Sequence, residues 1–138
     1  MNTPITGGCL CGAVRFECNA EPVLMLKCHC RDCQRLTGGP YVPVVVFPHS
    51  AFRVTCGRIQ YFATESEKGG QNLRGFCATC GGRLTGAESA ERGIIGVVAA
   101  SLDDPGIFKA KFEMFTADAQ PWDALEPQLP HFSQYFAK

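Results

Sequence analysis

Seven cysteines of this chain fall into three tight clusters whose spacing is typical of metal ligands. Cys9-x-Cys11 is followed by Cys28-x-Cys30-x2-Cys33 and then by Cys77-x2-Cys80. Structural zinc takes four ligands, whereas catalytic zinc keeps three protein ligands and one open position. The seven thiols divide as four plus three. We therefore expect the two pairs, Cys9, Cys11, Cys77 and Cys80 (the thiol quartet), to close one site, and Cys28, Cys30 and Cys33 (the thiol triplet) to form an open one.

The triplet predicts chemistry at its open position. A thiolate-rich zinc favours a soft fourth ligand, and a substrate thiol is such a ligand. Coordination would deprotonate that thiol and hold it as a nucleophile. Alternatively, His29 or Cys56 closes the site and makes it purely structural. His29 lies between two expected ligands, so its side chain should point away from the metal. Arg31, Asp32 and Arg35 could gather an anionic substrate or form an ordinary solvated surface.

The elements that position these thiols are mostly short strands. Residues 13–18 alternate apolar and polar side chains, which predicts a half-buried strand with Cys18 in the core. We expect further strands at 23–26, 41–47, 52–55, 58–62, 72–76, 94–100 and 112–115, the last of them the final strand, and one helical turn at 32–36. Pro43 predicts an edge strand or a bulge, and Cys56-Gly57 predicts a tight hairpin. The expected fold is all-β, in one domain over residues 1–138.

Composition excludes several classes of protein. Lysine plus arginine equal aspartate plus glutamate at 13 each, so no basic field is available to bind nucleic acid. The N-terminus lacks the features of a signal peptide, and no apolar run reaches the ~18 residues of a membrane span. We expect a soluble, cytoplasmic protein with no membrane partner. The odd count of nine cysteines also argues against a disulfide scaffold.

Taken together, the motifs resemble a known family. They are Gly8-Cys9-Leu10-Cys11-Gly12, Cys28-His29-Cys30-Arg31-Asp32-Cys33, Phe76-Cys77-Ala78-Thr79-Cys80-Gly81, Ser101-Leu102-Asp103-Asp104-Pro105 and Pro121-Trp122. Their order resembles the glutathione-dependent formaldehyde-activating enzymes, which share a domain with centromere protein V. Glu113 stands where many members carry a histidine.

The resemblance implies a zinc-stapled, Mss4-like β-sandwich or tent with two zinc ions per chain. The structural ion would be on Cys9, Cys11, Cys77 and Cys80, and the catalytic ion on Cys28, Cys30 and Cys33. The implied activity is that of a carbon–sulfur lyase that joins glutathione, or a related small thiol, to formaldehyde or another small aldehyde. The alternative is a non-catalytic carrier or protein-interaction module built on the same zinc-stabilised scaffold.

Overall fold

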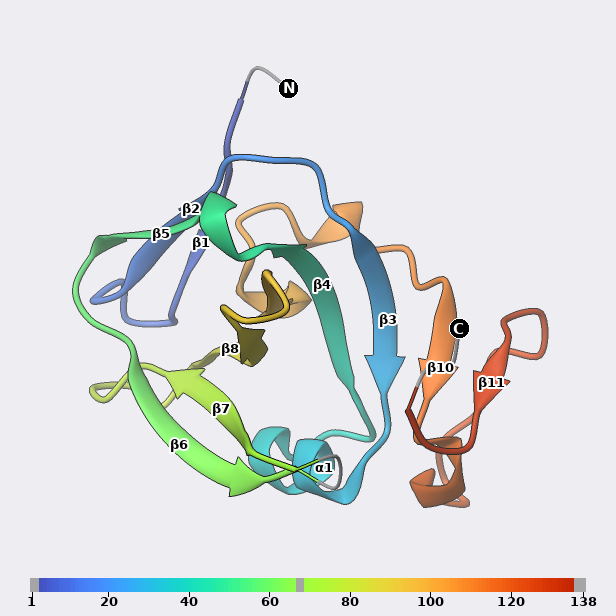
Figure 1. Cartoon of the computed structure of the whole chain (residues 1–138). Coiled ribbons are helices and arrows are strands. Elements are labelled where there is room, and N and C mark those ends of the chain that lie inside the picture. The colour runs from blue at the N-terminus through green and yellow to red at the C-terminus, as the bar shows by residue number, and fades with distance from the viewer. Residues whose placement is uncertain (1–2, 67–68, 136–138) are drawn as a thin grey trace.

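Two β-sheets make up most of the protein, as seen in a computed structural model that describes residues 3–66 and 69–135 (Figure 1). The strands are β1 (Ile5–Gly8), β2 (Arg15–Cys18), β3 (Leu24–Cys28), β4 (Val42–Pro48), β5 (Phe52–Cys56), β6 (Gln60–Glu65), β7 (Gln71–Phe76), β8 (Arg83–Ser89), β9 (Ile94–Val98), β10 (Phe112–Met114) and β11 (His131–Phe132). There is one α-helix, α1 (Arg31–Thr37), and short 3-10 turns cover His49–Ala51, Ala99–Ser101, Pro105–Ile107 and Thr116–Asp118. The prediction of an all-β fold is confirmed.

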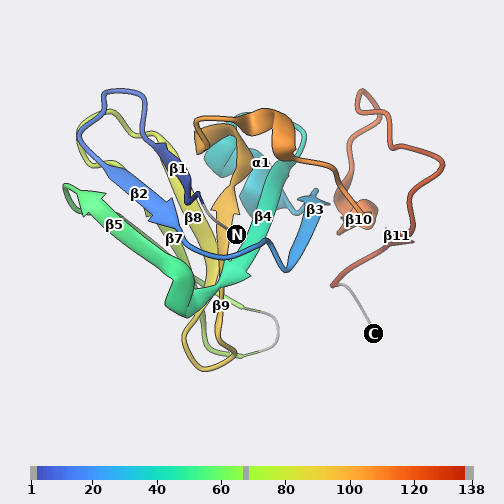
Figure 2. The ribbon, with the colours of Figure 1, turned by 90° about the horizontal axis from the view of Figure 1, so that it is seen from above.

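The larger sheet runs in the order β11-β10-β3-β4-β9-β8-β7-β6, and the smaller in the order β1-β2-β5. Neighbouring strands are antiparallel except that β10 is parallel to both β3 and β11. The larger sheet curves strongly, so that β6 and β7 lie at one side of the molecule and β10 and β11 at the other (Figure 1). The smaller sheet packs beside β7, β8 and β9 (Figure 2).

The main core lies between the two sheets and follows the alternation of their strands. Phe16 and Cys18 of β2 are buried, as the pattern of residues 13–18 predicts, and they pack against buried side chains of the larger sheet. Those side chains are Val45, Phe47, Leu84, Ile95 and Val97. Burial raises the pKa of Cys18 to about 12, so this thiol is a core residue and remains protonated.

A second core lies on the opposite face of the larger sheet. It contains Leu26 and Cys28 of β3, Val42 and Val46 of β4, Val98 of β9 and Phe112 of β10. Helix α1 begins just after β3, with the Sγ of Cys30 accepting a hydrogen bond from Cys33 N, and it ends at Gly38, whose φ is +74°. No helix within the described part of the chain is long and apolar enough to cross a membrane.

Three local predictions were wrong. Cys56-Gly57 does not join a hairpin, because β5 pairs with β2 in the smaller sheet whereas β6 pairs with β7 in the larger one. Gly57 instead carries the chain between the sheets with φ +74°, and a Cβ there would lie 2.0 Å from Ala13 O.

Strand β4 is interior, although Pro43 predicted an edge. The proline is tolerated because its register partner is Lys27 of β3, and it lies outside the β4–β9 pairing, which begins at Val44. Strand β10 is not the last strand either, because the short β11 follows it and pairs with it.

Candidate metal centres

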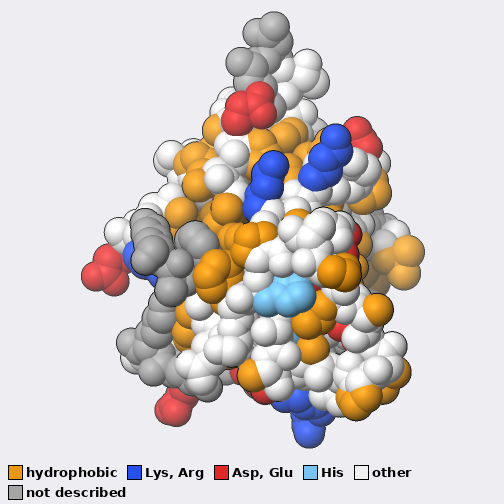
Figure 3. Space-filling view, turned by 90° about the vertical axis from the view of Figure 1, so that its right-hand side faces the viewer, with side chains coloured by type: hydrophobic (Ala, Val, Ile, Leu, Met, Phe, Trp, Pro, Cys, Tyr) orange, Lys and Arg blue, Asp and Glu red, His pale blue; other side chains and the backbone are white. Residues whose placement is uncertain are grey.

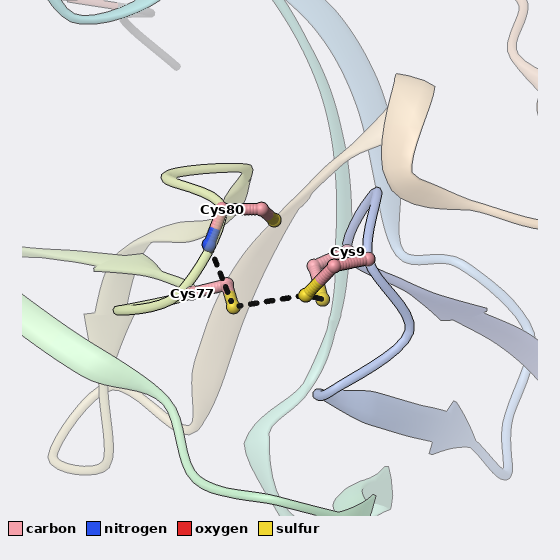
Figure 4. Close-up of side chains that lie close together, drawn as sticks. Cys9, Cys77 and Cys80 are labelled. Atoms are coloured by element: carbon pink, nitrogen blue, oxygen red, sulfur yellow. Dashed lines mark hydrogen bonds between the residues drawn. The ribbon is translucent and has the colours of Figure 1, made fainter.

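The thiol quartet is assembled from two segments that are far apart in the sequence. Cys9 and Cys11 lie in the turn between β1 and β2, and Cys77 and Cys80 lie in the turn between β7 and β8. All four Sγ atoms lie within 4.8 Å of one another. In Figure 4 the side chains of Cys9, Cys77 and Cys80 face one another across the gap between the two turns. The quartet therefore joins the smaller sheet to the larger one.

The spacing of the quartet fits a tetrahedral zinc ion. Four thiolates with zinc–sulfur bonds of ~2.3 Å place their sulfurs about 3.8 Å apart. Cys9 and Cys11 Sγ lie 3.7 Å apart, and Cys11 and Cys77 Sγ lie 3.8 Å apart. Burial raises the pKa of Cys9, but hydrogen bonds from Val14 N and from the neighbouring thiols outweigh it and bring the pKa to about 6. A thiol that ionises this readily suits a metal ligand.

The three cysteines of the thiol triplet come from one short segment of the sequence. Cys28 ends β3, Cys30 caps α1 and Cys33 lies in the first turn of α1. Cys33 and Cys28 Sγ lie 3.6 Å apart, close to the tetrahedral value, whereas Cys30 and Cys33 Sγ lie 2.8 Å apart and would have to separate by about 1 Å around an ion. Hydrogen bonds with Cys28 and Cys33 lower the pKa of Cys30, whereas the contacts of Cys28 with Cys30 and Cys33 raise the pKa of Cys28. A cation is needed before all three can be thiolates.

Neither residue that could have closed the triplet belongs to it. Cys56 is exposed at the end of β5 and is in neither thiol cluster. His29 is fully buried, and its Nε2 lies 2.7 Å from Glu113 Oε1, while its Nδ1 lies 3.0 Å from Asp123 Oδ2. The imidazole thus points toward these carboxylates, as its place between Cys28 and Cys30 predicted.

The contacts of His29 fix the backbone between two triplet cysteines. Glu113 is itself fully buried, and its Oε2 accepts a hydrogen bond of 2.5 Å from the amide of Glu126. Gln34 of α1 donates to the carbonyls of His29 and Asp118 at 2.6 and 2.9 Å. The strand that delivers Cys28 and the helix that carries Cys33 are therefore held against the C-terminal segment.

Two arginines beside the triplet were missed in the sequence analysis. Arg74 of β7 is 8% exposed, and its Nη1 lies 3.8 Å from Cys33 Sγ. Its positive charge helps to lower the pKa of Cys30, after the hydrogen bonds from the other two thiols. Arg83 of β8 interacts electrostatically with Arg74, Cys33 and Cys30. Of the charged residues singled out in the sequence, Asp32 lies 3.6 Å from Arg74 Nη2, whereas Arg31 and Arg35 are exposed.

Comparison with known proteins places the chain in a family. Comparison with the curated proteins gives no match. Among solved structures, the chain is similar to the crystal structure of a Rhodobacter sphaeroides protein from structural genomics, with 21% sequence identity, a TM-score of 0.58, and coverage of 92% of this chain and 99% of that chain. At this identity the likeness concerns the fold alone. A family model described as glutathione-dependent formaldehyde-activating enzyme matches residues 4–118. The chain therefore belongs to the glutathione-dependent formaldehyde-activating enzyme family.

Proposed function

We propose that this protein is a zinc-dependent enzyme of the carbon–sulfur lyase type that acts on a thiol and a small aldehyde. Glutathione and formaldehyde, which the family description names, are the leading candidates. The observation that carries the proposal is the thiol triplet. Its three sulfurs are gathered within 4.8 Å, and no fourth cysteine, histidine or carboxylate of the described residues joins them. Such a donor set leaves one coordination position for a substrate.

The two clusters have different roles in this proposal. Cys9, Cys11, Cys77 and Cys80 would hold a structural zinc, because four thiolates fill its coordination. Cys28, Cys30 and Cys33 would hold a catalytic zinc. When bound there, zinc supplies a Lewis acid that ionises a substrate thiol near neutral pH.

The reaction joins the substrate sulfur to the aldehyde carbon. The thiol loses its proton, the sulfur electron pair forms the new carbon–sulfur bond, and the carbonyl π pair moves to oxygen, which takes up a proton. Arg74 favours the thiolate form of the ligands, since its guanidinium lies 3.8 Å from Cys33 Sγ. The buried contacts of His29 with Glu113 and Asp123 hold the loop that carries Cys28 and Cys30.

Cobalt substitution tests this proposal. Protein loaded with cobalt in place of zinc should gain thiolate-to-metal charge-transfer absorption when glutathione is added, because a fourth sulfur enters the triplet site. Binding should also release a proton, since a thiol with a free pKa of about 8.5 must ionise. A glutathione analogue with serine in place of cysteine is the matched control and should produce neither signal. Four sulfur ligands at the triplet before any thiol is added would contradict the proposal.

The second candidate function is a zinc-stabilised interaction module. Leu10, between two quartet cysteines, is 92% exposed, and Trp122 is 70% exposed. Tryptophan is among the residue types that most often anchor protein–protein interfaces. The face that carries β10 and β11 shows charged side chains interspersed with hydrophobic ones (Figure 3), which does not favour nucleic acid as that partner. A closed triplet in the cobalt experiment would favour this module over the enzyme.

A further inference from the structure

Arg74 and Arg83 carry buried hydrogen-bond donors that no described residue satisfies. Nε of Arg74 and both Nε and Nη1 of Arg83 are buried without a hydrogen-bond partner in the described part of the protein. A buried polar group without a partner is unfavourable, and more so when it is charged. Two such groups side by side, next to a candidate catalytic cluster, suggest that their partner belongs to a ligand.

The two arginines differ in the anions near them. Arg74 Nη2 lies 3.6 Å from Asp32 Oδ2, and Nη1 lies near the Cys33 thiol. Arg83 donates from Nη2 to the carbonyl of Thr85 at 3.1 Å, and no carboxylate of the described residues forms an ion pair with it. Burial lowers the pKa of Arg83, and the charge of Arg74 lowers it further. Arg83 is thus the cation of this site that has no carboxylate partner among the described residues.

The backbone leaves room beside Arg83. Gly86 pairs with Gly96 of the next strand, so no side chain rises from the sheet at either position. A Cβ at Gly86 would meet only Arg83 Nη2, at 3.7 Å, whereas a Cβ at Gly96 would lie 2.8 Å from Gly86 O. The side chains of Val44 and Ala87 lie against Gly96. The open space is therefore at Gly86, next to the Arg83 guanidinium, where a small ligand group can fit.

We propose that Arg83, assisted by Arg74, binds a carboxylate of the thiol substrate and so selects acidic thiols over neutral ones. This inference rests on the proposed function, because it assigns a substrate class to the same site. A carboxylate on Arg83 would pair the buried guanidinium through charge-assisted hydrogen bonds. It would also orient the substrate so that its sulfur faces the triplet. Arg83 is a specificity-determining residue in this scheme, and the triplet carries the reaction.

The test compares two thiols that differ mainly in charge. Binding of 3-mercaptopropionate and of 2-mercaptoethanol to the zinc-loaded full chain is measured by calorimetry for the wild type, Arg83→Gln and Arg92→Gln. Arg92 is exposed in the turn after β8 and serves as the matched control. The quantity of interest is the ratio of the two affinities. Because each variant is compared with the wild type, differences in intrinsic thiol acidity cancel.

We expect Arg83→Gln to lower the ratio roughly tenfold to hundredfold, the usual effect of a hydrogen bond to a charged group. Arg92→Gln should leave the ratio unchanged. An unchanged ratio in Arg83→Gln would overturn the inference while leaving thiol binding, and hence the proposed function, intact. Arg83→Lys keeps the charge and should recover part of the ratio. If it binds mercaptoethanol normally but recovers none of the preference, the assignment of Arg83 is wrong.

A third ligand separates the two hypotheses further. 3-(Methylthio)propionate has the carboxylate but no ionisable thiol, so its binding does not require an open metal position. It should bind the wild type weakly and Arg83→Gln more weakly still. If both thiols fail to bind while this acid shows the Arg83 dependence, the proposed function fails and the anion site stands. Equal binding of this acid to the wild type and Arg83→Gln contradicts the anion site.

Discussion

Replacing Cys77 should destabilise the protein more than replacing Cys33, because the two cysteines close loops of very different length. Cys77 is 1% exposed and meets Cys11, which lies 66 positions away in the sequence. Cys33 meets Cys28, five positions away. Treating the metal as a cross-link of the unfolded chain, closing the longer loop contributes about 4 kcal/mol and closing the shorter one about 2 kcal/mol.

These free energies convert into melting temperatures. For a protein of this size, 1 kcal/mol corresponds to a change in Tm of about 3–4 °C. Zinc-loaded Cys77→Ser should therefore melt about 14 °C below the wild type, and Cys33→Ser about 7 °C below it. The assay is thermal unfolding followed by circular dichroism under reducing conditions. Cys56→Ser is the control, since Cys56 is exposed and outside both clusters, and its Tm should not change.

A chelator should lower the Tm of the wild type and of Cys77→Ser to different extents. Because the destabilisation acts through the metal, removing zinc should lower the Tm of the wild type by about 21 °C and that of Cys77→Ser by only about 7 °C, so that the two metal-free proteins melt together. Equal losses of stability in Cys77→Ser and Cys33→Ser would refute the distinction between a structural and a catalytic site. A difference between wild type and Cys77→Ser that persists unchanged in chelator would show that the cysteine acts by packing alone.

Three other perturbations test the fold around the sites. Arg15 holds the pKa of Asp103 at about 2. The ion pair between them is worth about 0.5–1 kcal/mol at this exposed position. It stabilises the fold above pH ~4 and is lost as the pH falls toward 2. Urea unfolding should show Asp103→Asn less stable at pH 6 and equal to the wild type near pH 2, and a pH-independent difference would contradict this. Leu84 is fully buried between the sheets, so Leu84→Ala should cost about 2–5 kcal/mol in urea unfolding, and a cost below about 1 kcal/mol would mean that the two sheets do not pack as described. Glu113→Ala removes the acceptor facing His29 in the core and should cost about 3 kcal/mol or more, whereas a variant as stable as the wild type would mean that the contact is not formed.

The features that could be predicted from the sequence are those whose causes are local. Metal ligands recur at short spacing because two of them must share one turn, so Cys77 and Cys80 could be paired by inspection. The alternation of residues 13–18 predicted which side chains of β2 enter the core. The end of helix α1 could be predicted from the Gly-Gly-Pro sequence that begins at Gly38, because these residues stop a helix, and Gly38 caps α1.

The features that were missed depend on which strands become neighbours. Cys56-Gly57 has the composition of a hairpin turn, and nothing local reveals that β5 and β6 belong to different sheets. Arg74 sits in a strand that gives no sign of its distant neighbour Cys33, and the sequence alone does not show that its side chain is buried. His29 and Glu113 are 84 positions apart, so their contact could not be foreseen from periodicity. A charged residue in an otherwise apolar strand, as at Glu113, was the one available signal.

The parallel pairing of β10 with β3 has a consequence for the growing chain on the ribosome. Cys28 lies opposite Met114 in this pair, so the edge of β3 that carries it stays unpaired until residue 114 has been synthesised. Chains emerge at about 5–20 residues per second, which leaves this edge open for several seconds. During that interval the triplet thiols are available to metal donors and to oxidants alike, whereas the completed C-terminal segment later covers His29 and the loop around it. The order of synthesis thus leaves the segment that carries the triplet unanchored at first, and the docking of β10 later fixes it in place.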